Sequence, residues 1–178
     1  MAKAVRRIVT GHHADGRSTV LIDGASPNVK QRQAGNASTL LWVTDETPAA
    51  LSESDRAARD IGVPPPTRGS IFRVAEFPPG GGADLRDNEA LLRDFGIGPD
   101  VARGHPPSHP AIHRTRSVDY VTVLEGEIDL LLDDGEVTLK AGDVVVQQGT
   151  NHAWINRGAA TCRLAMVFID AEEPSWAK

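Results

Sequence analysis

Four short runs of alternating or branched apolar residues lie between Ser108 and Asn156, and this stretch most constrains how the chain can fold. The runs read VDYVTVLE, EIDLLLDD, EVTLKA and DVVVQQ, and turns at Gly126, Asp134-Gly135 and Gly142 separate them. Such runs between glycine turns predict antiparallel strands in a meander or barrel. Asp134-Gly135 is the strongest hairpin signal, because both residues of such a turn must tolerate a positive φ.

Further strands are expected on both sides of this stretch. They are a hairpin in VRRIVTGHHADGRSTVLIDG, a strand at Thr39–Thr44, a strand at Ser70–Phe77 and a strand in TCRLAMVFID. Two short helices are also expected. The first is Ser52–Ile61, where Ser52 would be the N-cap and a proline run follows, and the second is Asp87–Phe95, which Gly96 would end.

Length and charge limit the class of protein. A chain of 178 residues, 40% of them hydrophobic, is long enough for one domain with a core of its own. The net charge of −5 argues against nucleic acid as a partner, and no apolar run is long enough to span a membrane or to act as a signal peptide. Cys162 is the only cysteine and permits no internal disulfide, so a cytoplasmic protein is expected.

Two histidine-centred motifs resemble those of the cupin superfamily. Their residues are His113, Thr115, Asp119 and Gly126 in the first motif, and Gly142, Asp143, Gly149, His152 and Asn156 in the second. The family pattern has histidine where Thr115 stands, glutamate where Asp119 stands and proline where Gln147 stands, and the run from Gly142 to Gln147 is one residue short. The resemblance covers roughly the last 100 residues and carries a degenerate metal motif.

The resemblance implies an all-β fold, the double-stranded β-helix or jelly roll. Residues 70–172 would form the barrel. Residues 1–69 would form an N-terminal extension of strands and loop or helix that packs on the barrel. Small jelly rolls commonly pair their exposed sheet edges, so a homodimer is expected.

The histidines are the candidate catalytic and metal-binding residues. In the jelly roll, His113 and His152 would come from neighbouring strands and meet inside the barrel, and the family match places Asp119 with them. Two imidazoles and a carboxylate would suit a divalent transition metal, with Fe, Mn, Ni, Cu or Zn all open, and they would leave coordination positions free. No organic cofactor is expected.

A metal-free site is equally open, because threonine is a poor ligand and aspartate is shorter than glutamate. His113 and His152 would then act as general acid and base, since their ordinary pKa lies near working pH. Asp119 would orient one imidazole. His109 or His105, in a proline-rich loop, could instead supply a missing ligand.

Several residues are candidate substrate contacts. Thr115 shares a strand face with His113, and Trp154 shares one with His152, where it would form an apolar wall or simply core. One of the two glutamines before the second motif should face the cavity, and Gln148 is the residue taken here. Tyr120 is also included, although on a regular strand it faces away from Asp119 and packing between sheets is the stronger interpretation.

Arg114 and Arg116 alternate with His113, so a solvated outer face or an interface is expected for both. Barrel filling is expected from a set of strand residues, namely Val121, Val123, Ile128, Leu130, Leu132, Val137, Leu139, Val144, Val146, Leu164, Met166 and Phe168. With 4% aromatic residues, the cavity should be lined chiefly by aliphatic groups and should accept a modest, mostly apolar organic substrate.

Three function classes follow. The first is a metal-dependent enzyme of the dioxygenase, isomerase or decarboxylase type that uses His113, Asp119 and His152. The second is a metal-free lyase, dehydratase or cyclase, and the third is a non-catalytic small-molecule binder. The fold does not distinguish them, because cupin barrels carry many unrelated chemistries.

Overall fold

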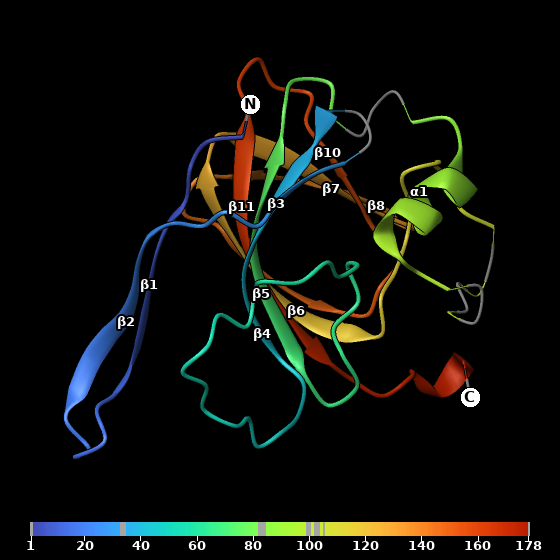
Figure 1. Cartoon of the computed structure of the whole chain (residues 1–178). Helices are drawn as coiled ribbons and strands as arrows, with labels where there is room; N and C mark the ends of the chain where they lie inside the picture. The colour runs from blue at the N-terminus through green and yellow to red at the C-terminus, as the bar shows by residue number, and fades with distance from the viewer. Residues whose placement is uncertain are drawn as a thin grey trace.

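The computed structural model describes residues 2–32, 35–81, 85–98, 101, 104 and 106–177. The described chain is mostly β-strand, as the sequence predicts (Figure 1). The strands are β1 (Arg6–His12), β2 (Ser18–Ala25), β3 (Val29–Gln31), β4 (Ala37–Thr44), β5 (Ser70–Phe77), β6 (Ser117–Glu125), β7 (Glu127–Leu132), β8 (Gly135–Lys140), β9 (Val144–Gln148), β10 (Ala153–Ile155) and β11 (Cys162–Asp170). Asn88–Phe95 form helix α1, and Ser175–Ala177 form a short 3₁₀ turn.

Two sheets form the barrel. The larger sheet has the strand order β3-β4-β5-β11-β6-β9, and the smaller one has the order β10-β7-β8. Val121 and Leu164 of the larger sheet belong to the same buried cluster as Ile128 and Leu130 of the smaller sheet. The apolar faces of the two sheets therefore share one core, and the jelly roll predicted from the sequence is confirmed.

Glycines with positive φ stand at the predicted strand boundaries, but the turn between β7 and β8 is at Asp133-Asp134, one residue earlier than predicted. Gly126 joins β6 to β7 with φ 76°, and Gly135 begins β8 with φ 101°, a region that side chains rarely adopt. A Cβ on Gly126 would also lie 2.9 Å from the carbonyl oxygen of Thr161. β7 and β8 pair in antiparallel order as predicted, whereas the turn at Gly126 takes the chain from β6 in the larger sheet to β7 in the smaller sheet.

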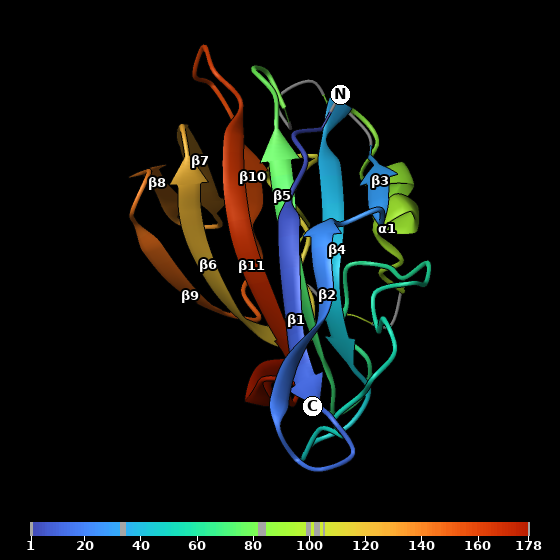
Figure 2. The ribbon, with the colours of Figure 1, turned by 60° about the vertical axis from the view of Figure 1, so that its left-hand side comes forward.

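The N-terminal strands fall into two groups. β3 and β4 extend the larger barrel sheet beside β5, whereas β1 and β2 form a separate hairpin. The hairpin lies outside the barrel, beside the outer face of β4 and β5 (Figures 1 and 2). β3 and β4 therefore share a sheet with the barrel strands, and the division of the chain at residue 70 stays a prediction.

One of the two expected helices forms. α1 begins after Asp87, whose carboxylate accepts the Ala90 N–H at 3.0 Å, and it ends at Gly96 in the left-handed conformation. The helix predicted at Ser52–Ile61 is wrong, because these residues form turns. The Asp55 carboxylate binds Arg7 and accepts the Ala57 N–H at 2.9 Å, which closes a local turn instead of capping a helix. Within the described part of the chain, no helix has the length and apolar character needed to cross a membrane.

The outer face of the larger sheet carries a row of apolar side chains. Register pairs Trp42 with Phe72, Phe72 with Val167, Val167 with Tyr120, and Tyr120 with Val146, so the row crosses five strands. Three residues predicted to fill the barrel are exposed, namely Val137, Val144 and Val146. The row provides the apolar face that a homodimer would need, and the homodimer stays a prediction.

Candidate active site

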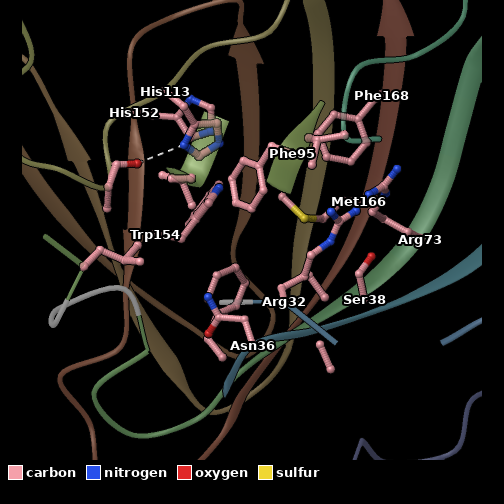
Figure 3. Close-up of a pocket in the computed structure, with 17 residues that line it drawn as sticks. Arg32, Asn36, Ser38, Arg73, Phe95, His113, His152, Trp154, Met166 and Phe168 are labelled. Atoms are coloured by element: carbon pink, nitrogen blue, oxygen red, sulfur yellow. Dashed lines mark hydrogen bonds between the residues drawn. The ribbon is translucent and has the colours of Figure 1, made fainter. Parts of the chain in front are cut away.

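The cavity lies inside the barrel and runs from a pair of histidines to a pair of arginines (Figure 3). α1 covers it with Leu91 and Phe95. The residues that line it are Arg32, Asn36, Ala37, Ser38, Val63, Arg73, Ala75, Phe77, Leu85, Leu91, Phe95, Ala111, His113, His152, Trp154, Met166 and Phe168.

His113 and His152 are brought together as the sequence predicts. Their backbones form an isolated antiparallel bridge, in which each N–H donates to the other's carbonyl oxygen at 2.9 Å. Their rings lie 4.4 Å apart between centroids, and both residues are buried. Phe95 packs edge-on against His113 at 4.8 Å, and Trp154 packs edge-on against His152 at 5.9 Å.

The hydrogen bonds of the two rings define their tautomer. His113 Nδ1 lies 2.9 Å from the Ala111 carbonyl oxygen, and His152 Nδ1 lies 3.0 Å from that of Thr150. A carbonyl oxygen can only accept, so each Nδ1 carries the proton and each neutral ring keeps its lone pair on Nε2. Burial lowers the pKa of His113 to about 4, and burial together with the nearby His113 lowers the pKa of His152 well below its ordinary value. Both rings are therefore neutral bases at neutral pH.

A chain of polar side chains connects Asp119 to His152. Gln147 Nε2 lies 2.9 Å from Asp119 Oδ2 and 3.2 Å from His152 Nε2, so the amide can donate one proton to each. Asp119 Oδ1 accepts the Ser117 hydroxyl proton at 2.6 Å, and Ser117 in turn accepts from Thr115 at 2.7 Å. Burial raises the pKa of Asp119 to about 6 despite these hydrogen bonds. Asp119 thus acts on His152 through Gln147.

The predicted metal ligands do not fit an ion in this arrangement. The amide nitrogen of Gln147, which is not a metal ligand, contacts both Asp119 and His152. Among the residues that the structure describes, no three His, Cys, Asp or Glu side chains are placed to hold an ion. His109 Nδ1 accepts the Ala111 N–H, and His105 lies outside the described residues.

Two of the predicted substrate contacts are corrected by the structure. Tyr120 is 50% exposed on the outer face, and Gln148 is also exposed. Register pairs Asp119 with Gln147, so Gln147 is the inward glutamine and Gln148 faces out. Thr115 is buried, but its hydroxyl binds Ser117 and it does not line the cavity. Trp154 does line the cavity.

Arg114 also departs from the expectation of an outer, solvated position. Its side chain is fully buried because the C-terminal segment covers it, with Glu173 paired to the guanidinium and the Trp176 ring 5.2 Å from it. Arg116 is 46% exposed, as expected, and lies 3.8 Å from Asp170.

Arg73 and Arg32 form the other end of the cavity and were missed by the sequence analysis. Arg73 is 4% exposed on the inward face of β5, between Ile71 and Ala75. The Arg32 side chain is 5% exposed and lies near Asp94. A signal for Arg73 was present, since it is the one charged residue at the inward-facing alternate positions of SIFRVAEF.

A jelly roll that places paired histidines in an apolar cavity is the architecture of a small-molecule cupin, and the comparisons with known proteins agree. Residues 101–168 match the family described as "Cupin domain" (Cupin_2). The chain is 34% identical over 176 residues to "Phomopsin biosynthesis cluster protein C'" of Diaporthe leptostromiformis, a match that covers 93% of this chain and 77% of that protein. This chain belongs to the cupin superfamily.

Two further proteins are similar to this chain. "Cupin-domain-containing oxidoreductase srdD" of Neurospora crassa is 29% identical over 181 residues, which cover 96% of this chain and 78% of that protein. Among solved structures, a Cupin 2 conserved barrel domain protein from Salinispora arenicola aligns with a TM-score of 0.42 and 14% identity, over 81% of this chain and 82% of that one.

Proposed function

We propose that this chain is an enzyme that moves a proton between two positions of a small organic substrate held in the barrel. The observation that carries the proposal is the state of the two histidines, which are buried, neutral and fixed with the lone pair on Nε2. His113 is the proton-transferring group. It lines the cavity, and among the described residues no side chain donates to its Nε2.

The low pKa of His113 favours proton return over net removal. A ring that accepts a proton in this apolar surrounding becomes a strong acid, because the charged form is poorly solvated. Such a group passes the proton quickly to a second substrate atom, for example a leaving hydroxyl or an adjacent carbon. The site therefore suits an isomerase, or a metal-free lyase, dehydratase or cyclase.

His152 and Trp154 position the substrate and the base. Gln147, held by Asp119, donates to His152 Nε2 and fixes that ring beside His113. Trp154 forms an apolar wall, and its indole N–H is buried without a partner among the described residues, which leaves a donor for a substrate oxygen. The name of the phomopsin relative refers to biosynthesis, which supports a small-molecule enzyme.

Hydrogen–deuterium exchange tests the proposal without knowledge of the natural substrate. Wild type and His113→Gln are incubated in D₂O with EDTA and with 4-phenyl-2-oxobutanoate or 3-phenylpropionaldehyde, and deuterium at the carbon next to the carbonyl is followed by NMR. Wild type should accelerate exchange, and His113→Gln should lower the enzymatic rate by about 10²–10⁴-fold.

His12→Gln is the matched control, because His12 is exposed on the β1–β2 hairpin and its loss should leave the rate unchanged. Equal exchange rates in wild type and His113→Gln would contradict the proposal. A wild-type sample without EDTA is measured as well. If exchange occurs in that sample and is absent with EDTA, the reaction needs a metal ion and the proposal of a metal-free enzyme is wrong.

A further inference from the structure

The arginine end of the cavity holds a buried positive charge without a matching carboxylate. The Arg73 guanidinium donates to the Gly62 carbonyl oxygen at 2.6 Å and lies 5.3 Å from the Phe168 ring centroid. Its Nε is buried and has no hydrogen-bond partner among the described residues, and no described carboxylate lies within ion-pair distance of Arg73. Removing a guanidinium from water is costly unless a counter-charge accompanies it.

The neighbouring charges increase this imbalance. Arg32 lies close to Arg73, and Figure 3 shows both side chains beside Met166. Arg32 has a carboxylate of its own, since it lies 3.6 Å from Asp94, and it also donates to the Asp94 carbonyl oxygen. Burial, and then the charge of Arg32, lower the pKa of Arg73 to about 9, and the charge of Asp119 only partly opposes this effect. Arg73 therefore remains charged at neutral pH, and one positive charge is left unmatched.

Access to this charge is possible from two sides. Arg32, Ser38 and Arg73 line both the inner cavity and a second cleft on the outside of the barrel. In that outer cleft, Lys30 is paired with Asp60, and Arg59 is paired with Asp45. Lys30 and Arg59 thus each have a carboxylate partner, although Arg59 shares Asp45 with Arg56. Arg73, at the inner boundary of the cleft, has no such partner among the described residues.

The inner cavity is lined by apolar side chains next to the Arg73 guanidinium. Phe95, Met166, Phe168 and Trp154 line the space between Arg73 and the histidines. Asn36 Oδ1 and Trp154 Nε1 are buried there without partners among the described residues, and both are neutral polar atoms that a ligand could contact. A ligand with one anionic group and an apolar body matches this distribution of charge and polarity.

We propose that Arg73, with Arg32 beside it, binds the carboxylate of a small monocarboxylic acid whose apolar body extends toward His113 and His152. A carboxylate matches the planar guanidinium through paired hydrogen bonds, and its single charge matches the single unpaired cation. A phosphate monoester, with close to two charges, would leave one of them unmatched. The identification of this acid as the substrate rests on the proposed function. Its binding at Arg73 is independent of the proposed function.

Isothermal titration calorimetry with matched probes tests the carboxylate site. The probes are 3-phenylpropionate, its neutral isostere 3-phenylpropionamide, and phenyl phosphate. Wild type should bind the carboxylate at least 10-fold more tightly than the amide and than the phosphate. Equal affinity for carboxylate and amide would overturn the proposal, and tighter binding of phenyl phosphate would overturn the choice of a monocarboxylate.

Arginine variants identify the side chain that binds the carboxylate of the probe. Arg73→Met should remove the preference for carboxylate over amide, and Arg73→Lys should retain the charge but weaken the preference several-fold. Arg116→Met is the matched control, because Arg116 lies on the outer surface, and it should bind as wild type does. If Arg73→Met does not fold, Arg73→Lys decides alone, and an unchanged preference in either Arg73 variant would overturn the proposal.

Two measurements keep this proposal separate from the proposed function. His113→Gln should still prefer the carboxylate, because the anion binds at the other end of the cavity. If His113→Gln loses exchange activity but still binds the carboxylate, the anion site at Arg73 is supported independently of the proposed reaction. The Trp154 indole N–H signal in ¹H–¹⁵N NMR should shift on addition of 3-phenylpropionate. An unshifted Trp154 signal with normal binding would place the ligand in the outer cleft and overturn the inward placement.

Discussion

The histidine end and the arginine end of the cavity are both buried, and burial has opposite consequences for them. At the histidine end, burial lowers the pKa of His113 to about 4, so the ring is uncharged at neutral pH. At the arginine end, burial lowers the pKa of Arg73 only to about 9, so the guanidinium keeps its charge. The neutral imidazole of His113 can accept a proton from a substrate, whereas the charged guanidinium of Arg73 is stabilised by a bound anion.

The hydrogen bonds of the two ends differ in the same way. Both Nδ1 atoms of the histidines donate to backbone carbonyl oxygens, and His152 Nε2 accepts from Gln147. At the other end, Arg73 Nε has no partner among the described residues. The orientation of both imidazole rings is therefore fixed without a ligand, although His113 Nε2 and the Trp154 indole N–H have no partner among the described residues. At the arginine end, it is the charge of Arg73 that has no described carboxylate beside it. The difference supports the two proposals, proton transfer at the histidine end and anion binding at the arginine end.

Placing a charge at the histidine end should produce the largest change in stability. His113→Lys would bury an ammonium group against Phe95 and the His152 ring, without a carboxylate in contact. We expect a loss of about 3–5 kcal/mol in the free energy of unfolding, measured by urea denaturation. His12→Lys, at an exposed position, should stay within about 0.5 kcal/mol of wild type. A tolerated lysine at position 113 would mean that this end is not a neutral environment.

The pH dependence of stability should show the buried histidine directly. The pKa of His113 is about 4 in the folded protein, against an ordinary value of 6.5. The unfolded chain therefore binds the proton first, and stability falls as pH decreases from 6.5 to 4, by about 3 kcal/mol for this residue. Denaturation at several pH values measures the slope, and His113→Gln should reduce it.

Asp119 should act in the opposite direction. Its folded-state pKa is raised to about 6, so its contribution to stability is largest below 3.8 and is lost as pH rises toward 6. Asp119→Asn should therefore steepen the net dependence on pH. A profile that neither variant changes would contradict the burial of both groups.

Removing the charge at the arginine end should have a smaller effect of the opposite sign. Arg73→Met replaces an unmatched buried cation with an apolar side chain, and we expect a gain of about 1–4 kcal/mol in the free energy of unfolding. Arg163→Met is the contrasting variant, because Arg163 is paired with Glu76 at 3.2 Å and its loss leaves a buried carboxylate unpaired. Arg163→Met should destabilise the protein, and destabilisation by both variants would mean that Arg73 has a structural role.

Weakening α1 should have the smallest effect on the free energy of unfolding. It should affect both the histidine end and the arginine end of the cavity. Phe95 on α1 lies 4.8 Å from the His113 ring and 5.8 Å from the Arg32 guanidinium. Asp87→Ala removes the N-cap of α1 and should cost about 1 kcal/mol. Hydrogen exchange should then increase in α1 more than in β5. Equal increases in both elements would mean that α1 is not an independent cover.

The strands were predictable because alternation and glycine turns are local properties of the sequence. β5 lies where the pattern places it, and the hairpin of β7 and β8 forms as expected. Its turn is at Asp133-Asp134, one residue earlier than predicted, because Gly135 already pairs with Leu132. The helix expected at Ser52–Ile61 failed because Asp55 binds Arg7, which lies far away in the sequence. Arg114 was placed outside for a related reason, since only the fold brings Glu173 to it.

The histidine pair was predictable from the motifs, but its surroundings were not. The choice between Gln147 and Gln148 depends on a register of one residue, which the pairing with Asp119 fixes. Arg32 lies in an irregular segment before β4, and its closeness to Arg73 depends on how the N-terminal strands extend the larger sheet. Pattern alone carries no information on such contacts.

The most direct test of the account is ¹⁵N NMR of the imidazole rings, assigned with the His113→Gln and His152→Gln variants. Both rings should carry their proton on Nδ1 and keep Nε2 unprotonated from pH 7 to pH 5. Neither EDTA nor added Zn²⁺ should shift the two Nε2 signals. Doubly protonated rings at pH 7, or Nε2 signals that move together with Zn²⁺, would contradict the claim that this is a neutral, metal-free proton-transfer site.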